Sequence, residues 1–254
     1  MNKNNRKAKD YLVLALDVDT IEEAKILVKE LKDYVGTFKV GLQLYTSAGP
    51  DVIKMIYEEG AKIFFDGKFF DIPNTVAKAS ANLVKMGVSS FNVHIQGGSK
   101  MLNTTVKVAR ETAKKYGLEK PTILGATTLT SFGQRTLTEE IKINMNIDEY
   151  IIYLAKLAKS SGLDGVIATT TDASKFKQEC GQDFIVMCPA TRPTWSVVND
   201  QVRVITPKDA IKAGVDYMVI GRPITAAEDR VSAANLILDE IENALSRQEE
   251  SLFI

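Results

Sequence analysis

The chain has 254 residues, of which 45% are hydrophobic and 25% are charged, which is an ordinary globular composition. Lys plus Arg and Asp plus Glu both number 32, so the formal net charge is zero. This balance argues against a nucleic-acid-binding or polyanion-binding surface. The sequence contains no run of about 18 apolar residues and therefore predicts no membrane span.

The N-terminal residues are basic, and the apolar stretch that follows is too short for a signal peptide and runs into Asp17. We expect residues 1–10 to form a flexible tail and residues 247–254 to form a C-terminal tail. Cys180 and Cys188 are the only cysteines, which favours a reduced, cytoplasmic protein without a disulfide framework. The single histidine, His94, argues against a zinc site and against a serine-type triad.

Eight short apolar runs follow one another along the chain. They occupy residues 11–17, 38–42, 62–68, 91–95, 122–129, 165–170, 184–190 and 217–223. They are rich in Val, Ile, Phe and Leu and show little polar alternation, which is typical of parallel strands buried on both faces.

Amphipathic segments separate these runs, and several of them end at a glycine. The clearest helical patterns cover residues 21–34, 74–87, 147–162 and 232–245. A series of about eight strand–helix units in roughly 250 residues predicts a (β/α)₈ TIM barrel. We expect a single domain over residues 11–246. The alternative is an open doubly wound sheet, but no G-x-G-x-x-G motif follows the first run.

Polar residues gather where the predicted strands end, which is where barrel enzymes carry their chemistry. These residues are Asp17, Lys39, Asp66, Lys68, His94, residues 127–131, residues 169–171, Arg192 and Arg222. His94 alone is more often a polar residue with satisfied hydrogen bonds than a catalyst, and we leave it out of the predicted catalytic set.

Asp66, Lys68 and Asp71 bring alternating charges to the end of the third run, beside Asp17 and Lys39. On a regular strand Asp66 and Lys68 point to the same side. A structural ion-pair network is one interpretation. Because buried charges are costly, five charged groups from three consecutive strands favour a catalytic site. A lysine between two carboxylates keeps its proton, so Lys68 is suited to protonate a carbanion.

The loops after the last two runs predict a phosphate site, since barrels often bind phosphate there. Gly221 permits close approach of a backbone N–H, and Arg222 offers a fork of donors. Arg192 and Gln201 lie on a long loop that is a candidate lid.

The chain resembles the orotidine 5′-phosphate decarboxylase family over nearly its whole length. The resemblance rests on LALD, FKVG, DGKFFDIPNT, NVH, TLTS, the Arg-Pro at 192–193, DQVRVITP and AGVDYMVIGRPIT. It implies conversion of orotidine 5′-monophosphate (OMP) to UMP, the last step of de novo pyrimidine nucleotide synthesis, without metal or organic cofactor.

The resemblance also implies individual roles. Lys68 would protonate C6 of the pyrimidine, and Asp66 would face the departing carboxylate. Lys39 and Asp17 would contact the ribose, and Lys39 would also join the catalytic charges. Thr130 would contact the pyrimidine edge. The phosphate would be held by Arg192, Gln201, Gly221 and Arg222.

The family further implies a homodimer with shared active sites, in which Asp71 and Thr75 reach into the partner subunit's site. Two residues depart from the family pattern: Phe70 stands where many relatives carry histidine, and Gly67 where they carry a larger apolar residue. CPATRP also replaces the TPGIRP of many bacterial relatives. Neither Phe70 nor Gly67 is charged, so the implied activity stands.

Two other functions compete with this interpretation. A sugar-phosphate lyase or decarboxylase of the same superfamily, such as a hexulose-phosphate synthase, would generally use a metal ion. A catalytically idle barrel could serve as a binding subunit. The presence of Lys39, Asp66, Lys68 and Asp71 together disfavours an idle barrel.

Overall fold

The computed structural model describes residues 6–129, 131–189, 191–193, 195 and 205–251. Eight strands follow one another in chain order and form a closed barrel. The strands are β1 (Leu12–Ala15), β2 (Thr37–Gly41), β3 (Ile63–Phe69), β4 (Ser90–His94), β5 (Thr122–Ala126), β6 (Gly165–Ile167), β7 (Ile185–Pro189) and β8 (Tyr217–Ile220). The predicted (β/α)₈ barrel is thereby confirmed, and each strand overlaps one predicted apolar run.

Helices alternate with these strands along the chain. They are α1 (Ile21–Leu31), α2 (Leu42–Ala48), α3 (Asp51–Glu58), α4 (Pro73–Lys85), α5 (Gly98–Tyr116), α6 (Ile147–Ser160), α7 (Thr170–Cys180), α8 (Pro207–Lys212), α9 (Arg222–Thr225) and α10 (Arg230–Ser251). Shorter helical turns occur at η2 (Ala8–Tyr11), η3 (Ile95–Gly97) and the π-type η4 (Thr136–Glu140). All four segments with clear helical patterns are helical.

Local sequence sets the starts of several helices. Thr20 caps α1: its side chain accepts the Glu23 N–H, and the Glu23 carboxylate accepts the Thr20 N–H. This reciprocal arrangement satisfies two donors that the first turn would otherwise leave unpaired. Helix α4 begins at Pro73, where the fixed φ of proline suits the first turn. Helix starts therefore follow local chemistry closely.

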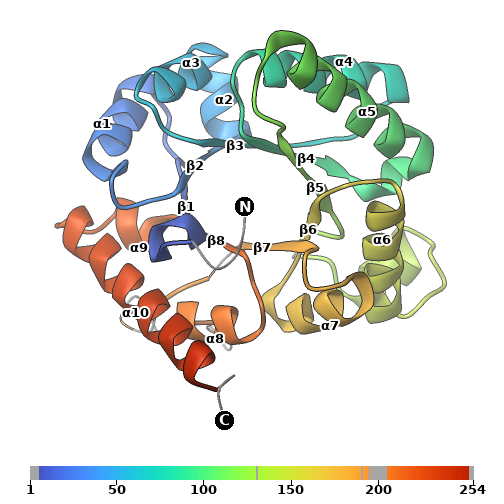
Figure 1. Cartoon of the computed structure of the whole chain (residues 1–254). Helices are drawn as coiled ribbons and strands as arrows, with labels where there is room; N and C mark the ends of the chain where they lie inside the picture. The colour runs from blue at the N-terminus through green and yellow to red at the C-terminus, as the bar shows by residue number, and fades with distance from the viewer. Residues whose placement is uncertain (1–5, 130, 190, 194, 196–204, 252–254) are drawn as a thin grey trace. The chain divides into compact units, whose positions relative to one another are not determined.

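The described chain forms two compact units, the first within residues 1–66, 86–88 and 187–254, and the second within residues 67–85 and 89–186. In Figure 1 the first carries the blue and the orange-to-red parts of the chain. Within it, β7 pairs with β8, β8 with β1, β1 with β2 and β2 with β3, all parallel. Within the second, β5 pairs in parallel with β4 and with β6.

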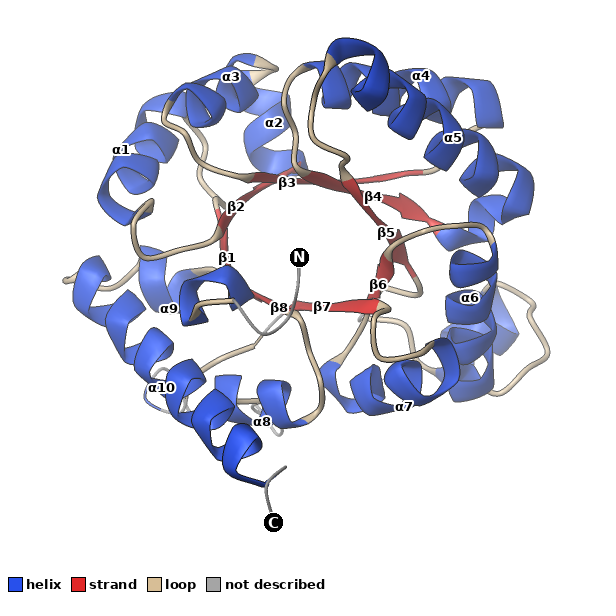
Figure 2. Cartoon of the chain, in the orientation of Figure 1, coloured by secondary structure: helices blue, strands red, loops and turns tan. Residues whose placement is uncertain are grey.

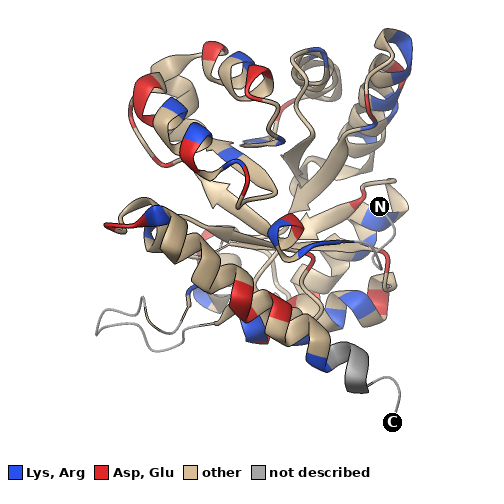
Figure 3. Ribbon diagram, turned by 60° about the vertical axis from the view of Figure 1, so that its left-hand side comes forward, with Lys and Arg blue, Asp and Glu red and all other residues tan. Residues whose placement is uncertain are grey.

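In each unit, helices cover the strands (Figure 2), and most of the strand residues are apolar and buried. All of β1 is buried, and Phe38, Phe64 and Phe91 are among the largest fully buried side chains. The charged residues lie mainly on helices and loops (Figure 3). Cys180 and Cys188 are both free and buried. In the described ranges, no helix is both long and apolar enough to cross a membrane.

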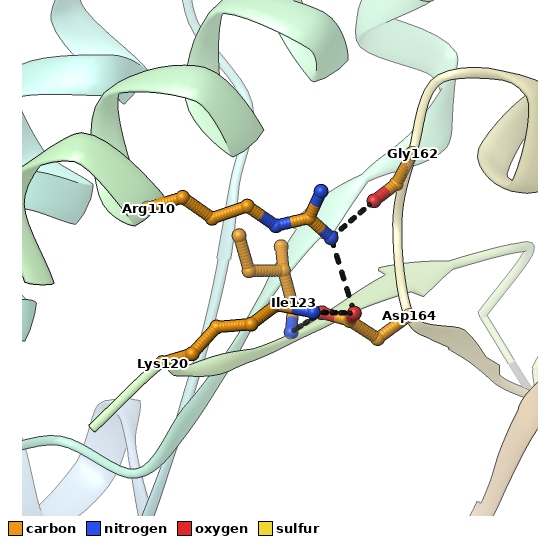
Figure 4. A network of polar contacts seen from close by, with 5 residues as sticks. All are labelled: Arg110, Lys120, Ile123, Gly162 and Asp164. Carbon is orange, nitrogen blue, oxygen red and sulfur yellow. Dashed lines mark hydrogen bonds and ion pairs between the residues drawn. The ribbon is translucent and has the colours of Figure 1, made fainter. Parts of the chain in front are cut away.

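A polar network ties the amino ends of β5 and β6 together (Figure 4). Asp164, which immediately precedes β6, accepts hydrogen bonds from Arg110 at 3.1 Å, from Lys120 at 2.9 Å and from the Ile123 N–H at 2.9 Å. Arg110 also donates to the Gly162 carbonyl at 2.8 Å. Because it binds backbone groups as well as side chains, the network fixes the entry of both strands into the sheet.

Candidate active site

Three charged residues meet at the carboxyl ends of β1, β2 and β3, as the sequence predicts. The Lys39 Nζ lies 3.0 Å from Asp17 Oδ1 and 4.0 Å from Asp66 Oδ2. Strand register explains the meeting, because Lys39 pairs with Ala15 on one side and with Phe64 on the other. The Lys39 side chain is only 12% exposed, whereas that of Asp17 is 59% exposed. Lys39 therefore sits withdrawn from water with a carboxylate on either side.

The space for the Lys39 ammonium depends on a glycine. A Cβ added at Gly41 would lie 3.0 Å from the Lys39 Nζ, which is tighter than ordinary contacts allow. A Cβ at position 41 would require the Lys39 ammonium to shift by a few tenths of an ångström. Gly41 was not among the predicted site residues, and its place two residues after Lys39 is the only sequence signal for this role.

Lys68 lies on β3 two residues beyond Asp66, but its backbone departs from strand geometry. Its φ is +45°, in the left-handed region that side-chain-bearing residues rarely adopt. Its N–H donates to the Asn92 Oδ1 at 2.7 Å. The regular alternation on which we placed Asp66 and Lys68 on the same side is thus interrupted at Lys68. The direction of its side chain is set by this local backbone conformation.

Asp71 and Thr75 lie beyond β3 and are both exposed. Asp71 Oδ1 accepts the N–H of Ile72 at 2.6 Å, and the Thr75 N–H donates to the Ile72 carbonyl at 3.0 Å in the first turn of α4. Phe70 and Ile72 expose 61% and 66% of their surface. The predicted role of Asp71 and Thr75 in a partner subunit stays a prediction.

The predicted phosphate residues follow β7 and β8. Gly221 precedes α9 and lies against the end of β1, where an added Cβ would be 3.4 Å from the Ala15 Cβ and 3.7 Å from Asp17 Oδ2. Arg222 begins α9 and is exposed. The Arg192 N–H donates to the Ile205 carbonyl at 2.9 Å, and both residues belong to the loop between β7 and β8 that is the predicted lid. Thr130 and Gln201 lie outside the described residues.

His94 ends β4, and its ring lies 5.7 Å from that of Phe70. Burial, and secondarily the charge of Lys68, lowers the pKa of His94 below its ordinary value. The buried Nδ1 has no hydrogen-bond partner in the described part of the chain. The expectation that His94 is a polar residue with satisfied hydrogen bonds is therefore not met by the described protein groups at this nitrogen. The lowered pKa favours the neutral ring, which is the form least penalised by burial.

Asn92 is a second residue that was not among the predicted site residues. It lies in the middle of β4, is fully buried, and accepts the backbone N–H of Lys68. The available signal was an asparagine inside the apolar run FNVHI, at a position where burial without a hydrogen bond is costly.

A (β/α)₈ barrel with acidic and basic side chains at the carboxyl ends of its strands has the construction of a barrel enzyme. No three His, Cys, Asp or Glu side chains in the described ranges are grouped to hold a metal ion. Residues 10–237 match the sequence profile of the Orotidine 5′-phosphate decarboxylase / HUMPS family. The chain belongs to this family and is an enzyme of it.

Individual relatives support the same assignment. The chain is 44% identical to an orotidine 5′-phosphate decarboxylase of Syntrophotalea carbinolica, over 94% of this chain and 98% of the relative. It is 43% identical to the enzyme of that name from Moorella thermoacetica, over 92% and 93% of the two chains. The crystal structure of orotidine 5′-phosphate decarboxylase from Lactobacillus acidophilus superposes with a TM-score of 0.81 at 35% identity, covering 91% and 98%.

Proposed function

We propose that this enzyme decarboxylates OMP to UMP in de novo pyrimidine nucleotide synthesis. The supporting observation is the group formed by Lys39 with Asp17 and Asp66, with Lys68 further along the same strand as Asp66. The names of the relatives at 44% and 43% identity point to the same reaction. The sequence places a cationic acid near a fixed carboxylate, which suits loss of an anionic group followed by protonation.

In the proposed reaction the bond between C6 of the pyrimidine and its carboxylate carbon breaks, and CO₂ leaves. The electron pair stays on C6, and the Lys68 ammonium transfers a proton to it, so the product is UMP. Lys68 is then neutral and regains a proton from water. General acid catalysis of this kind contributes about 10²- to 10⁴-fold, and electrostatic stabilisation of the carbanion supplies the larger part. Asp66 is the carboxylate next to which this transfer occurs.

Lys39 and Asp17 are proposed to hold the ribose. The 3.0 Å ion pair between them fixes the Lys39 ammonium at the end of β2. Asp17 is the more exposed partner, so its second oxygen can accept a hydroxyl hydrogen bond. Lys39 also belongs to the catalytic charges because it lies 4.0 Å from Asp66. It would keep the Asp66 carboxylate in one place during the reaction.

The phosphate is proposed to bind at Gly221 and Arg222, with Arg192 and Gln201 from the loop after β7. Gly221 lies beside the end of β1, so a phosphate there would be near the ribose residue Asp17. Arg222 is exposed, and its guanidinium offers a fork of donors that suits two phosphate oxygens. Thr130 is proposed as the contact to the pyrimidine edge. Phosphate binding energy far from C6 can lower the barrier if it is expressed in the transition state.

A homodimer with shared sites completes the proposal. Asp71 and Thr75 are exposed beside Phe70 and Ile72, two large apolar side chains that are more than half exposed. Apolar surface of this kind next to polar groups is typical of interfaces. Asp71 and Thr75 would thus enter the partner subunit's site. The barrel domain over residues 11–246, the two tails and a cytoplasmic location remain part of the same proposal.

The reaction is proposed to need neither metal nor organic cofactor. The test mixes the purified chain with OMP in excess EDTA and follows the loss of ultraviolet absorbance, with UMP identified by chromatography. We expect turnover equal to that without EDTA. Absence of UMP, or its loss on chelation, would refute the proposal; a metal requirement would favour a sugar-phosphate chemistry within the family. Lys68→Ala serves as the inactive control.

A further inference from the structure

The backbone of Lys68 is held in a conformation that it would not adopt by itself. A φ of +45° within a strand is disfavoured for a residue with a Cβ, by about 1–2 kcal/mol. Among the described residues the only other non-glycine residue with positive φ is Lys142, which is exposed after η4. Such strain persists only where the surroundings impose it, and it concentrates at functional sites.

Asn92 contacts the backbone at this position. Its Oδ1 accepts the Lys68 N–H at 2.7 Å, a short distance for an N–H donor. The residue is 0% exposed and lies between Phe91 and Val93, which are equally buried. An apolar residue would be the default at such a position, since burying a carboxamide is costly unless it is hydrogen-bonded. The buried carboxamide of Asn92 therefore contacts the one residue that is proposed to transfer the proton.

We propose that Asn92 is a positioning residue: by accepting the Lys68 N–H, it fixes the left-handed backbone at Lys68 and so aims the Lys68 ammonium. The inference rests on the proposed function, because it needs Lys68 as the proton donor. It adds a residue on β4 to a site otherwise built from charged groups and phosphate contacts.

The physical link runs through the Cα–Cβ bond. If Lys68 relaxed to the negative φ of an ordinary strand, its Cα–Cβ bond would turn, and the ammonium at the end of the side chain would move with it. A displacement of about 1 Å in a catalytic group can cost about 100-fold in rate. The substrate would still bind, because the residues proposed to hold ribose and phosphate lie elsewhere. The loss should consequently fall on kcat and leave KM nearly unchanged.

The test compares Asn92→Leu, which has similar shape but no acceptor, with Asn92→Asp, which keeps the acceptor oxygen. We expect kcat for OMP to fall about 100-fold in Asn92→Leu, with KM and UMP affinity close to those of the unsubstituted enzyme. Amide hydrogen exchange at Lys68 should accelerate in the same variant. Asn92→Asp should recover most of kcat and of the exchange protection. Asn92→Ala replaces Asn92→Leu if the larger side chain prevents folding.

Asp164→Ala is the control. Asp164 lies in the same unit as Asn92 but at the amino ends of the strands, so its loss should lower stability without lowering kcat. Unchanged kcat in a folded Asn92→Leu variant would overturn the inference, as would equal losses in Asn92→Leu and Asn92→Asp. A rise in KM matching the fall in kcat/KM would also overturn it. Failure of the unsubstituted enzyme to convert OMP would instead refute the proposed function, so the two failures are distinct.

Discussion

Two groups of charged side chains lie at opposite ends of strands, and each contains a carboxylate of nearly the same burial. Asp66, at the carboxyl end of β3, has a side chain that is 18% exposed, and that of Asp164, just before β6, is 17% exposed. Each carboxylate lies within ion-pair distance of at least one lysine. Neither the burial nor the charge of these two carboxylates therefore separates the groups.

The two groups differ in what their charged side chains bind. Asp164 binds the Ile123 N–H as well as Arg110 and Lys120, and Arg110 in turn binds the Gly162 carbonyl. That network joins the chain segments that enter β5 and β6. The Lys39 ammonium instead lies between the side chains of Asp17, which follows β1, and Asp66, which lies on β3. Contacts to backbone groups indicate a structural role, and paired side chains at carboxyl ends indicate a catalytic one.

The largest expected effect is that of Lys68→Ala at the carboxyl end of β3. Loss of the proposed proton donor should reduce turnover of OMP by about 10⁴-fold, while the free energy of unfolding changes little. Steady-state kinetics and urea denaturation measure the two quantities. Lys142→Ala is the matched control, since Lys142 also has positive φ but is exposed away from the strands. Near-normal turnover in Lys68→Ala would remove Lys68 from the mechanism.

Arg222→Ala tests whether Arg222, which follows β8, contacts the substrate phosphate at the carboxyl ends of the strands. Loss of charge-assisted hydrogen bonds to phosphate should lower kcat/KM for OMP by about 3 kcal/mol, or about 100-fold. Activity toward orotidine, which lacks the phosphate, should barely change. Arg230→Ala is the control, because Arg230 pairs with Glu30 at 3.0 Å in the same unit. Equal losses on both substrates would rule out a phosphate contact.

Asp164→Ala should show the reverse pattern. Its removal leaves Arg110 and the Ile123 N–H without their carboxylate, which should lower the free energy of unfolding by about 2 kcal/mol. The corresponding fall in Tm is about 6 °C for a domain of this size, measured by calorimetry. Asp164→Asn keeps an acceptor and should lose only about half as much. A large fall in kcat, measured at temperatures below Tm, would contradict the assignment of a structural role to the amino ends of the strands and of a catalytic role to their carboxyl ends.

His94 gives the smallest effect. Burial, with a further contribution from Lys68, holds its pKa in the folded chain below the ordinary 6.5. The unfolded chain therefore binds a proton at a pH where the folded chain does not. The resulting stability is present above pH 6.5 and is lost as the pH falls through the pKa of the folded state.

Urea denaturation across this pH window checks the effect, and His94→Gln should remove its contribution. Because His94 is the only histidine, its ring C–H resonance also reports the titration directly by NMR. A titration midpoint for His94 at or above its ordinary pKa would show that the ring is better solvated than its environment suggests. Such a result would weaken the link between His94 and Lys68.

The sequence predicted most of the fold because the signals are local. Apolar runs without polar alternation marked each strand, and 3–4 spacing marked the helices that cover them. The helical pattern over residues 74–87 matched α4 (Pro73–Lys85) to within two residues at each end. The same logic predicted that Asp17, Lys39 and Asp66 would meet, because each follows or ends a strand in a series whose neighbours pair in parallel.

Other features depended on contacts between distant segments. The sequence determined which strands exist, their order and which charged residues they deliver, since those properties follow from hydrophobic pattern and residue type. Only the tertiary structure decided the backbone of Lys68, because its N–H meets Asn92 from a strand 24 residues away. It likewise decided that Asp164 is structural, because packing brings Arg110, Lys120 and the Ile123 N–H to one carboxylate. Neither the period-two pattern of strands nor the 3.6-residue pattern of helices encodes contacts between such distant segments.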